Sequence, residues 1–312
     1  MGLILAFPGQ GAQKVGMGRD LAEASPAARE MFERIDAALD VPLSRLMWEG
    51  PEDELTLTHN AQPAILAHSV AMLAALGDGV SSAVAALGHS LGEYSAYVAA
   101  GALAPEDAAR LVRRRGELML EAGQQRPGAM AAVLGLPSSE VEAACAEASG
   151  SDDVAVAANL NAPDQTVVSG NPAAVERASA NCKARGARRV VPLKVSGAFH
   201  SPLMAPAAEG LAEVLAAVPF EDPRIPVFAN ATAEPVRTAA AARRLLVEQL
   251  TSPVRWVECV EAAAQLGGDA SFLEIGPGTV LSGLIRRIAP GSATAAAGTA
   301  ADLAGFTAPI RS

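Results

Sequence analysis

The chain has 312 residues, half of them hydrophobic and 19% charged, and its formal net charge is -10. This composition is typical of a folded globular protein with a sizeable core, and it excludes an intrinsically disordered chain. Because an acidic protein repels phosphate groups, nucleic acids and anionic membranes are disfavoured as partners.

The cysteines and the N-terminus favour a cytoplasmic protein without a metal. The three cysteines lie far apart and show neither a disulfide framework nor a zinc-ligand spacing. The N-terminus lacks the basic and apolar regions of a signal peptide. The most apolar stretch, residues 63–87, is interrupted by His68 and Asp78, which disfavours a membrane span. We therefore expect a soluble cytoplasmic monomer.

Short apolar runs alternate with helical patterns in the first and last parts of the chain. We expect strands at 3–7, 83–87 and 272–275, and helices at 26–39, 62–76, 93–100 and 279–284. Ser25 can cap the helix that begins at Pro26. This alternation predicts a parallel α/β sheet with both faces covered. The alanine-rich tail after Pro290 predicts a helix and a loop.

Residues 127–195 follow a different order. Strand-like and helical patterns alternate here as βαββαβ, at 129–136, 139–148, 154–160, 166–170, 172–185 and 189–194. Ser139 and Glu142 fit a capping box for the first of these helices. The order is that of a ferredoxin-like unit. We predict a small subdomain of residues 127–195, inserted into a large α/β subdomain of residues 1–126 and 196–312, with the active site in the cleft between them.

The strongest local signal is the sequence GHSLG at residues 88–92, between a predicted strand and a predicted helix. A sharp turn there projects the Ser90 hydroxyl above the sheet, and the glycines let neighbouring backbone pass close by. Ser90 then lies at a helix N-terminus, where free N–H groups such as that of Leu91 can stabilise an oxyanion. We interpret Ser90 as a nucleophile; a chance match in a Gly- and Ala-rich chain is the alternative.

A serine hydroxyl needs a base that accepts its proton. His59 lies in a polar stretch and His68 in an apolar helical pattern, so both favour structural roles. His89 adjoins Ser90, and neighbours at such a turn point apart, so His89 is a poor base and is better suited to shaping the turn. His200, in a loop that leads into a helix, is the remaining candidate, with an ordinary loop histidine as the alternative. No acidic residue is marked as its partner, and a backbone carbonyl can orient the imidazole instead.

Seven motifs occur in one order along the chain, and together they resemble the malonyl-CoA:acyl carrier protein transacylase family. They are FPGQGAQ at 7–13, NAQPA at 60–64, GHSLGEYSA at 88–96, RRRGELM at 113–119, GAMAAVLGL at 128–136, GAFHSPLM at 197–204 and EIGPGTVLSGL at 274–284. The match covers essentially the whole chain. The resemblance implies a hydrolase-like parallel-sheet core with an inserted ferredoxin-like α+β subdomain.

The resemblance also implies the catalytic residues. Ser90 would be the acylated nucleophile and His200 its base. The backbone N–H groups of Gln10 and Leu91 would form the oxyanion hole. The main-chain carbonyl of Gln249 would orient His200.

Four further positions match substrate-binding residues of the family. Arg115 would bind the malonyl carboxylate in a planar, two-pronged pair, and neutral acyl groups would leave its charge unmatched. Without the resemblance, the arginine run at 113–115 favours a solvated basic helix face. Met119 and Gln165 would line the pocket. Phe199, a bulky aromatic beside His200, favours malonyl over branched acyl groups by analogy.

The implied reaction is transfer of a malonyl group from malonyl-CoA to the thiol of a holo acyl carrier protein in fatty acid biosynthesis, with no metal or redox cofactor. An acidic carrier protein needs a local positive patch, for which Arg113, Arg114 and the basic run at 183–189 are candidates; solvated surface charge is the alternative. Three other readings share parts of the pattern: a free-standing acyltransferase of a polyketide synthase, a thioester hydrolase, and a non-catalytic scaffold.

Overall fold

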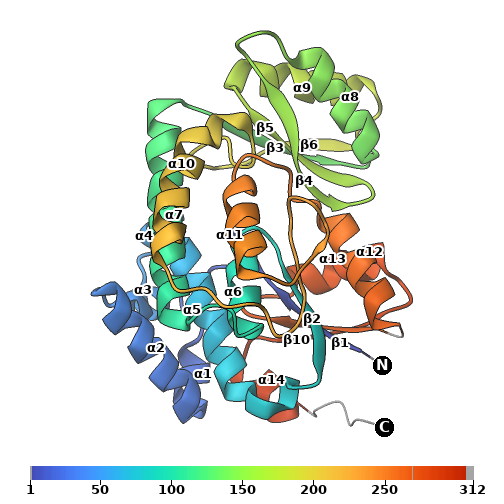
Figure 1. The fold of residues 1–312 in the computed structure, drawn as a ribbon. Helices are drawn as coiled ribbons and strands as arrows, with labels where there is room; N and C mark the ends of the chain where they lie inside the picture. Colours follow the sequence, from blue (N-terminus) through green and yellow to red (C-terminus); the bar gives the residue numbers. More distant parts are fainter. Residues whose placement is uncertain (1, 269, 307–312) are drawn as a thin grey trace.

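The computed structural model describes residues 2–268 and 270–306, and the strands of these residues form two sheets (Figure 1). The larger sheet has the strand order β10-β9-β1-β2-β7-β8. Its strands are β1 (Leu3–Phe7), β2 (Ala83–Gly88), β7 (Val227–Phe228), β8 (Pro235–Val236), β9 (Ser271–Ile275) and β10 (Ala293–Ala297). Neighbouring strands are parallel except β7 and β8, which pair antiparallel.

Both faces of the larger sheet are covered, and β1 shows why. All five of its residues are buried. Leu3, Leu5 and Phe7 belong to a large core shared with α2, α5, α6 and α7, whereas Ile4 and Ala6 belong to a second core shared with α12 and α13. A strand without polar positions suits a sheet that is buried on both sides. The predicted parallel α/β core is confirmed.

The helices that accompany this sheet come from both ends of the chain. They are α1 (Arg19–Ala24), α2 (Pro26–Leu39), α3 (Leu43–Glu49), α4 (Glu52–Thr56), α5 (Thr58–Leu76), α6 (Gly92–Ala99), α7 (Pro105–Gln125), α10 (Ala205–Ala217), α11 (Ala239–Glu248), α12 (Trp256–Gly267), α13 (Val280–Ile288) and α14 (Ala300–Gly305), with the 3-10 turns η1 (Gly77–Val80) and η2 (Pro202–Met204). Ser25 caps α2 as predicted, since its Oγ accepts from the Ala28 N–H at 3.3 Å.

Helix α5 is long and apolar enough to cross a membrane by length and composition, with a mean hydropathy of 1.4. However, 67% of that stretch is buried inside the protein, where α5 packs against α2, α6 and α7. A helix that is apolar on all sides is expected when it is surrounded by protein. Its hydropathy therefore reflects its place in the core.

The smaller sheet has the order β4-β5-β3-β6 and is antiparallel throughout. Its elements are β3 (Ala129–Leu134), α8 (Ser138–Ala148), β4 (Ala155–Ala162), β5 (Gln165–Gly170), α9 (Pro172–Ala184) and β6 (Arg189–Pro192). On β3, Ala131 and Val133 pack in a core with α8 and α9, while Met130 belongs to the core of the larger sheet. In Figure 1 this unit lies at the top, away from both termini. The element order is that of a ferredoxin-like unit, and the boundaries at 127 and 195 remain our proposal.

Local structure differs from the predictions in two places. The predicted helix of the tail after Pro290 is present as α14, but residues 293–297 before it form the edge strand β10, which pairs parallel with β9 and was not predicted. Alanine has the highest helix propensity, but propensity is a small effect per residue, and pairing with the edge of β9 outweighs it. The predicted capping box at Ser139 is wrong, because α8 already begins at Ser138 and no side chain caps it.

The smaller sheet is held beside the GHSLG turn by the segment between α11 and α12 and by a contact of Asn161 in β4 with His89. The Leu160 N–H of β4 donates to the carbonyl of Val254 at 2.9 Å, and the Val254 N–H donates to the carbonyl of Ala158 at 2.8 Å. The chain that returns from β6 runs against α7, where a Cβ on Gly123 would lie 2.0 Å from the carbonyl oxygen of Ser196. A glycine is therefore needed at position 123 for residues 196–200 to approach the turn.

Candidate active site

Ser90 lies at the tip of a tight turn between β2 and α6, with a left-handed φ of 53°. Glycines are required on both sides of it. A Cβ on Gly88 would lie 2.0 Å from the carbonyl carbon of Gly92, and a Cβ on Gly92 would lie 2.2 Å from the carbonyl oxygen of Phe7. The Ser90 N–H donates to Asn230 Oδ1 at 2.7 Å. Packing against β1 and this hydrogen bond hold Ser90 in a backbone conformation that serine rarely adopts.

His200 lies directly against Ser90. Its Nε2 is 2.8 Å from Ser90 Oγ, and its Nδ1 is 2.8 Å from the carbonyl oxygen of Gln249. Because a carbonyl oxygen can only accept, Nδ1 carries the proton and Nε2 is free to accept one from Ser90. Burial, and then the nearby Arg115 cation, lower the pKa of His200 to about 3. The imidazole is therefore neutral near pH 7, as a general base must be.

The side chain of Arg115, in α7, points toward Ser90 and is 1% exposed. Its Nη2 donates to Ser90 Oγ at 3.1 Å and to Gln249 Oε1 at 2.9 Å, and its Nη1 donates to Gln62 Oε1 at 2.7 Å. The guanidinium also lies 5.8 Å from the centre of the Tyr94 ring. All three hydrogen-bond acceptors are uncharged, and Arg115 Nε donates to no atom of the described residues. A buried cation with neutral acceptors has an unmatched charge that an incoming anion can neutralise.

The other two arginines of the run have a different environment. Arg113 pairs with Glu117 at 2.9 Å, and Arg114 pairs with Glu121 at 2.9 Å, in both cases along the outer face of α7. Arg113 and Arg114 are thus ion-paired and partly exposed, whereas Arg115 lies on the buried face of the same helix.

The two predicted oxyanion donors lie at adjacent backbone turns. Leu91 precedes α6 directly. The turn with Gln10 packs against the same region, since a Cβ on Gly9 would lie 2.5 Å from the carbonyl oxygen of His89. Within residues 2–268 and 270–306, the backbone N–H groups of Gln10 and Leu91 have no protein acceptor. This arrangement is compatible with the predicted oxyanion hole, which stays a prediction.

The predicted pocket residues divide into two groups. Met119 lies at the site, where its sulfur accepts from Gln62 Nε2 at 3.4 Å, and Phe199 is buried next to His200. Gln165 is engaged elsewhere. Its Oε1 accepts from Arg287 Nη1 at 2.9 Å, and no described residue of the Ser90 cluster forms a hydrogen bond with it. The pocket role of Gln165 therefore has no geometric support and stays a prediction.

Three site residues were missed by the sequence analysis. Gln62, in the NAQPA motif, binds Arg115. Asn230 binds both Ser90 N–H and, through Nδ2, the carbonyl of Gly88 at 2.8 Å. Glu93 is fully buried three residues after Ser90 and binds Asn230 and Gln249. A motif points to Gln62 and Glu93, but the sequence around Asn230 carries no such signal.

The remaining histidines have structural surroundings. His89 Nε2 donates to Asn161 Oδ1 of β4 at 2.7 Å, and the His89 ring lies 5.5 Å from the Trp256 ring. His68 is 1% exposed in α5, and burial lowers its pKa to about 4. His59 is partly buried, and burial followed by the Arg113 charge lowers its pKa. These contacts agree with the structural roles expected for all three.

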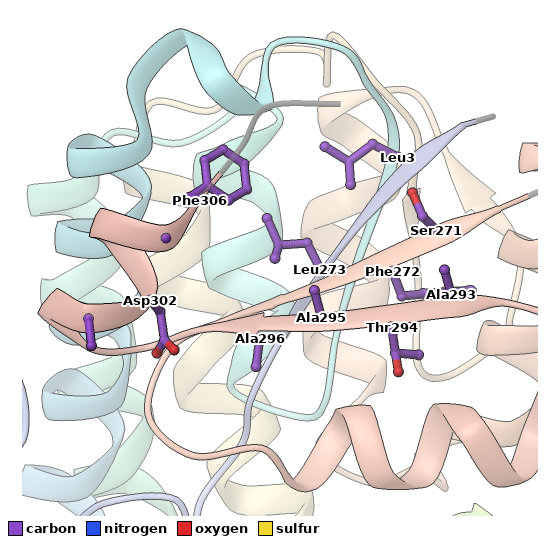
Figure 2. Close-up of a pocket in the computed structure, with 12 residues that line it drawn as sticks. Leu3, Ser271, Phe272, Leu273, Ala293, Thr294, Ala295, Ala296, Asp302 and Phe306 are labelled. Atoms are coloured by element: carbon purple, nitrogen blue, oxygen red, sulfur yellow. The ribbon is translucent and has the colours of Figure 1, made fainter. Parts of the chain in front are cut away.

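A cavity of about 500 Å³ lies elsewhere, between the edge of the larger sheet and α14 (Figure 2). Figure 2 shows that strand residues and Phe306 line it, with Thr294 and Asp302 among the polar side chains. Thr294 accepts from Arg286 Nε at 2.8 Å, and Asp302 caps α14 together with Thr299. These polar groups are engaged in local structure, so the chemistry of the described chain is concentrated at Ser90.

Comparison with known proteins agrees with this geometry. The acyl transferase domain family matches residues 5–306. The chain belongs to this family. The malonyl CoA-acyl carrier protein transacylase of Bacillus subtilis is 46% identical over 282 residues, which cover 90% of this chain and 89% of that protein. The protein of the same name from Escherichia coli K12 is 45% identical over 283 residues, which cover 90% and 91%.

Solved structures resemble this acyl transferase over nearly its whole length. An acyl carrier protein S-malonyltransferase from Vibrio cholerae has a TM-score of 0.93 at 40% identity and covers 98% of this chain and 99% of its own. A malonyl-transacylase in complex with its type II polyketide synthase acyl-carrier protein has a TM-score of 0.93 at 42% identity and covers 97% and 98%. The family resemblance and the α/β fold class predicted from the seven motifs are confirmed.

Proposed function

We propose that this acyl transferase moves a malonyl group from malonyl-CoA to the phosphopantetheine thiol of a holo acyl carrier protein, through an ester on Ser90. One observation carries the proposal: Ser90 Oγ lies 2.8 Å from His200 Nε2 and 3.1 Å from Arg115 Nη2. A neutral base and an unmatched buried cation thus meet at one hydroxyl. That combination suits an acyl group that carries its own carboxylate.

In the first half-reaction, Ser90 Oγ attacks the thioester carbonyl while His200 Nε2 accepts the hydroxyl proton. The N–H groups of Leu91 and Gln10 stabilise the oxyanion of the tetrahedral intermediate. The carbon–sulfur bond then breaks, and the thiolate of coenzyme A leaves with the proton from His200. The carbonyl of Gln249 holds Nδ1–H throughout, so the ring keeps the tautomer that the cycle requires.

In the second half-reaction, the carrier thiol replaces coenzyme A. His200 accepts the thiol proton, the sulfur attacks the malonyl ester, and Ser90 regains its proton as the ester bond breaks. The competing acceptor is water. Because His200, Gln249 and Arg115 are all buried, the ester forms in a place with restricted water access, which favours transfer over hydrolysis.

Selectivity for malonyl rests on Arg115. Before the substrate arrives, its guanidinium binds Gln62, Gln249 and Ser90, which are all neutral. A malonyl carboxylate supplies the missing negative charge, whereas an acetyl group leaves the cation unmatched in a buried site. Phe199 restricts the space beside His200, in agreement with an unbranched acyl group.

The carrier protein docks on the small subdomain, at the basic run of residues 183–189. Arg185 is neutralised by two carboxylates of α8. Lys183, Arg188 and Arg189 are exposed, and none of them has an ion-pair partner in the part of the chain that the structure describes. These three free cations suit an acidic partner better than the paired arginines of α7 do.

Two cellular settings fit this chemistry: fatty acid biosynthesis, and supply of malonyl groups to a polyketide synthase. We favour the first, which is the setting that the resemblance of the seven motifs implies. The complex of a related malonyl-transacylase with a polyketide carrier protein supports the second. We propose that the enzyme is a cytoplasmic monomer, and carrier preference distinguishes the two settings.

Intact-mass measurement tests the proposed function. The purified chain is mixed with malonyl-CoA alone and then with holo acyl carrier protein. We expect a mass gain of one malonyl group, which disappears when carrier protein is added and reappears on the carrier. Ser90→Ala should gain no mass; a malonylated Ser90→Ala chain, or loss of the malonyl group to water as fast as to carrier protein, would refute the proposal.

The docking surface is tested by charge reversal. Arg188→Glu with Arg189→Glu should lower malonyl transfer to carrier protein by about 10-fold or more, while Ser90 acylation by malonyl-CoA keeps its rate. Arg45→Glu, on exposed α3, is the matched control and should change neither rate. Equal loss in both half-reactions would contradict docking at this surface.

A further inference from the structure

The buried carboxyl of Glu93 has no part in the chemistry described above, yet it contacts both residues that hold the catalytic groups. Glu93 lies in the first turn of α6 and has no exposed surface. Its Oε2 accepts from Gln249 Nε2 at 2.7 Å and from the backbone N–H of Asn230 at 3.0 Å. Charged groups are rarely buried without such partners, and their removal leaves the partners unsatisfied.

Gln249 connects Glu93 to the reacting groups. Its Nε2 donates to Glu93 and, at 3.1 Å, to the carbonyl of Ser90, while its Oε1 accepts from Arg115 Nη2 at 2.9 Å. All the neighbours of Nε2, a third and longer one at Asn230 Oδ1 included, are acceptors and the neighbour of Oε1 is a donor, so only one orientation of the amide satisfies them. Its main-chain carbonyl binds His200 Nδ1. The hydrogen bond to Glu93 thus fixes the orientation of the Gln249 amide, and the amide in turn fixes the position of the Arg115 guanidinium.

Glu93 is connected to Arg115 through Gln249 and does not contact it. Within residues 2–268 and 270–306, Arg115 has no ion-pair partner, and its direct acceptors are neutral. Glu93 lies one amide away, at the end of the chain Arg115–Gln249–Glu93. Burial raises the pKa of Glu93 to about 7, while the hydrogen bonds from Asn230 and Gln249 oppose the increase. Neutral and ionised forms of Glu93 both retain an oxygen that can accept from Gln249.

We propose that Glu93 is the positioning residue of the active site: by accepting from Gln249, it fixes the amide that aligns Arg115 for the substrate carboxylate. The inference rests on the proposed function. It separates two roles within Gln249, whose main chain serves His200 and whose side chain serves Arg115. Loss of Glu93 should therefore affect recognition of malonyl more than the attack of Ser90 itself.

A double-mutant cycle tests this positioning role. Glu93→Met removes the acceptor and keeps the volume, and Gln249→Met removes the amide and keeps the main-chain carbonyl. The readout is the malonyl-over-acetyl preference, taken as the ratio of the second-order rates at which malonyl-CoA and acetyl-CoA acylate Ser90. Each single variant should lower this ratio by about 10- to 100-fold, the range expected for one hydrogen bond to a charged group. The double variant should lower it no further than the larger single effect.

Two further variants separate positioning from a general loss of structure. Glu93→Gln keeps an accepting oxygen and should retain the malonyl preference within about threefold. Glu274→Met is the matched control, because Glu274 is an equally buried carboxyl that accepts from the N–H groups of Leu281 and Ser282, away from Ser90. It should lower the melting temperature and leave the malonyl preference unchanged.

The outcomes are distinct. If the effects of Glu93→Met and Gln249→Met multiply, or if Glu93→Gln loses the preference, Glu93 does not act through the amide. If Glu93→Met fails to fold, Gln249→Met alone decides, and an unchanged preference in that variant overturns the proposal. A wild-type chain that shows no preference for malonyl-CoA refutes the proposed function instead, before any variant is compared.

Discussion

Arg115→Ala is the substitution that most directly tests how the site selects its acyl group. Arg115 is 1% exposed and donates to Gln62, Gln249 and Ser90. Alanine removes the guanidinium and leaves room where the malonyl carboxylate would bind. The base is untouched, because His200 keeps its contacts with Ser90 and Gln249. Malonyl transfer should therefore fail through loss of recognition while the nucleophile remains competent.

The magnitude follows from burial. Removal of one partner from a buried, hydrogen-bonded ion pair costs about 3–5 kcal/mol. This corresponds to a fall of about 200- to 5,000-fold in kcat/KM for malonyl-CoA. Acetyl-CoA makes no such pair, and in the wild-type enzyme it leaves a buried cation unmatched. The variant should therefore acylate Ser90 with acetyl-CoA at least as fast as the wild type does.

A second effect of Arg115→Ala concerns pH. Burial is the first cause of the low pKa of His200 and the Arg115 charge is the second. Loss of that charge raises the pKa of His200. Since the neutral imidazole is the base, the rate falls as the pH drops through this pKa. The acid limb of the acetyl-CoA profile should start at a higher pH in the variant than in the wild type.

The assay is quenched-flow acylation of Ser90 with each thioester across a pH series. Arg114→Ala is the matched control, because the neighbouring arginine is partly exposed and paired with Glu117 and Glu121. It should change neither the malonyl preference nor the acid limb. If Arg115→Ala stays folded, keeps its malonyl preference and shows an unshifted acid limb, Arg115 is not the carboxylate-binding group.

Two predictions concern the stability of the fold. Gly92→Ala places a Cβ 2.2 Å from the carbonyl oxygen of Phe7 and should lower the melting temperature strongly. Gly283→Ala is the control, because Gly283 also lies in a helix but has open space around it, and this substitution should change the melting temperature by only a few degrees. Calorimetry of both variants measures whether the close approach at Gly92 matters. His68 is neutral when folded, with a pKa of about 4 against an ordinary 6.5, so the unfolded state binds more protons between these values. Between pH 6.5 and about pH 4, the free energy of unfolding should fall on acidification by on the order of 1 kcal/mol per pH unit. Urea titrations at several pH values measure this dependence, and His68→Leu should remove the part that comes from His68. An identical pH dependence in the variant would contradict the buried neutral state.

Local patterns in the sequence were sufficient for most of the fold. The apolar run at residues 3–7 and the capped pattern at 26–39 became β1 and α2 with the predicted bounds. Both depend on short-range properties: continuous burial for the strand, and a Ser cap followed by proline for the helix. Residues 293–297 show where local patterns are insufficient. They form a strand because they pair with β9, and the alanine-rich sequence itself gives no sign of that pairing.

What the sequence by itself determined about the site is the set of groups with intrinsic chemistry: a serine in a Gly-flanked turn, and a histidine left as its base. What only the tertiary structure decided is which neutral and charged groups surround them. Three consecutive arginines are equivalent in sequence, and packing alone puts Arg115 inside while Arg113 and Arg114 face solvent. Glu93, Asn230 and Gln249 meet although more than 130 residues separate Glu93 from the other two along the chain. Reactivity belongs to a side chain and its immediate neighbours, whereas alignment depends on contacts that form only when distant segments share one buried space.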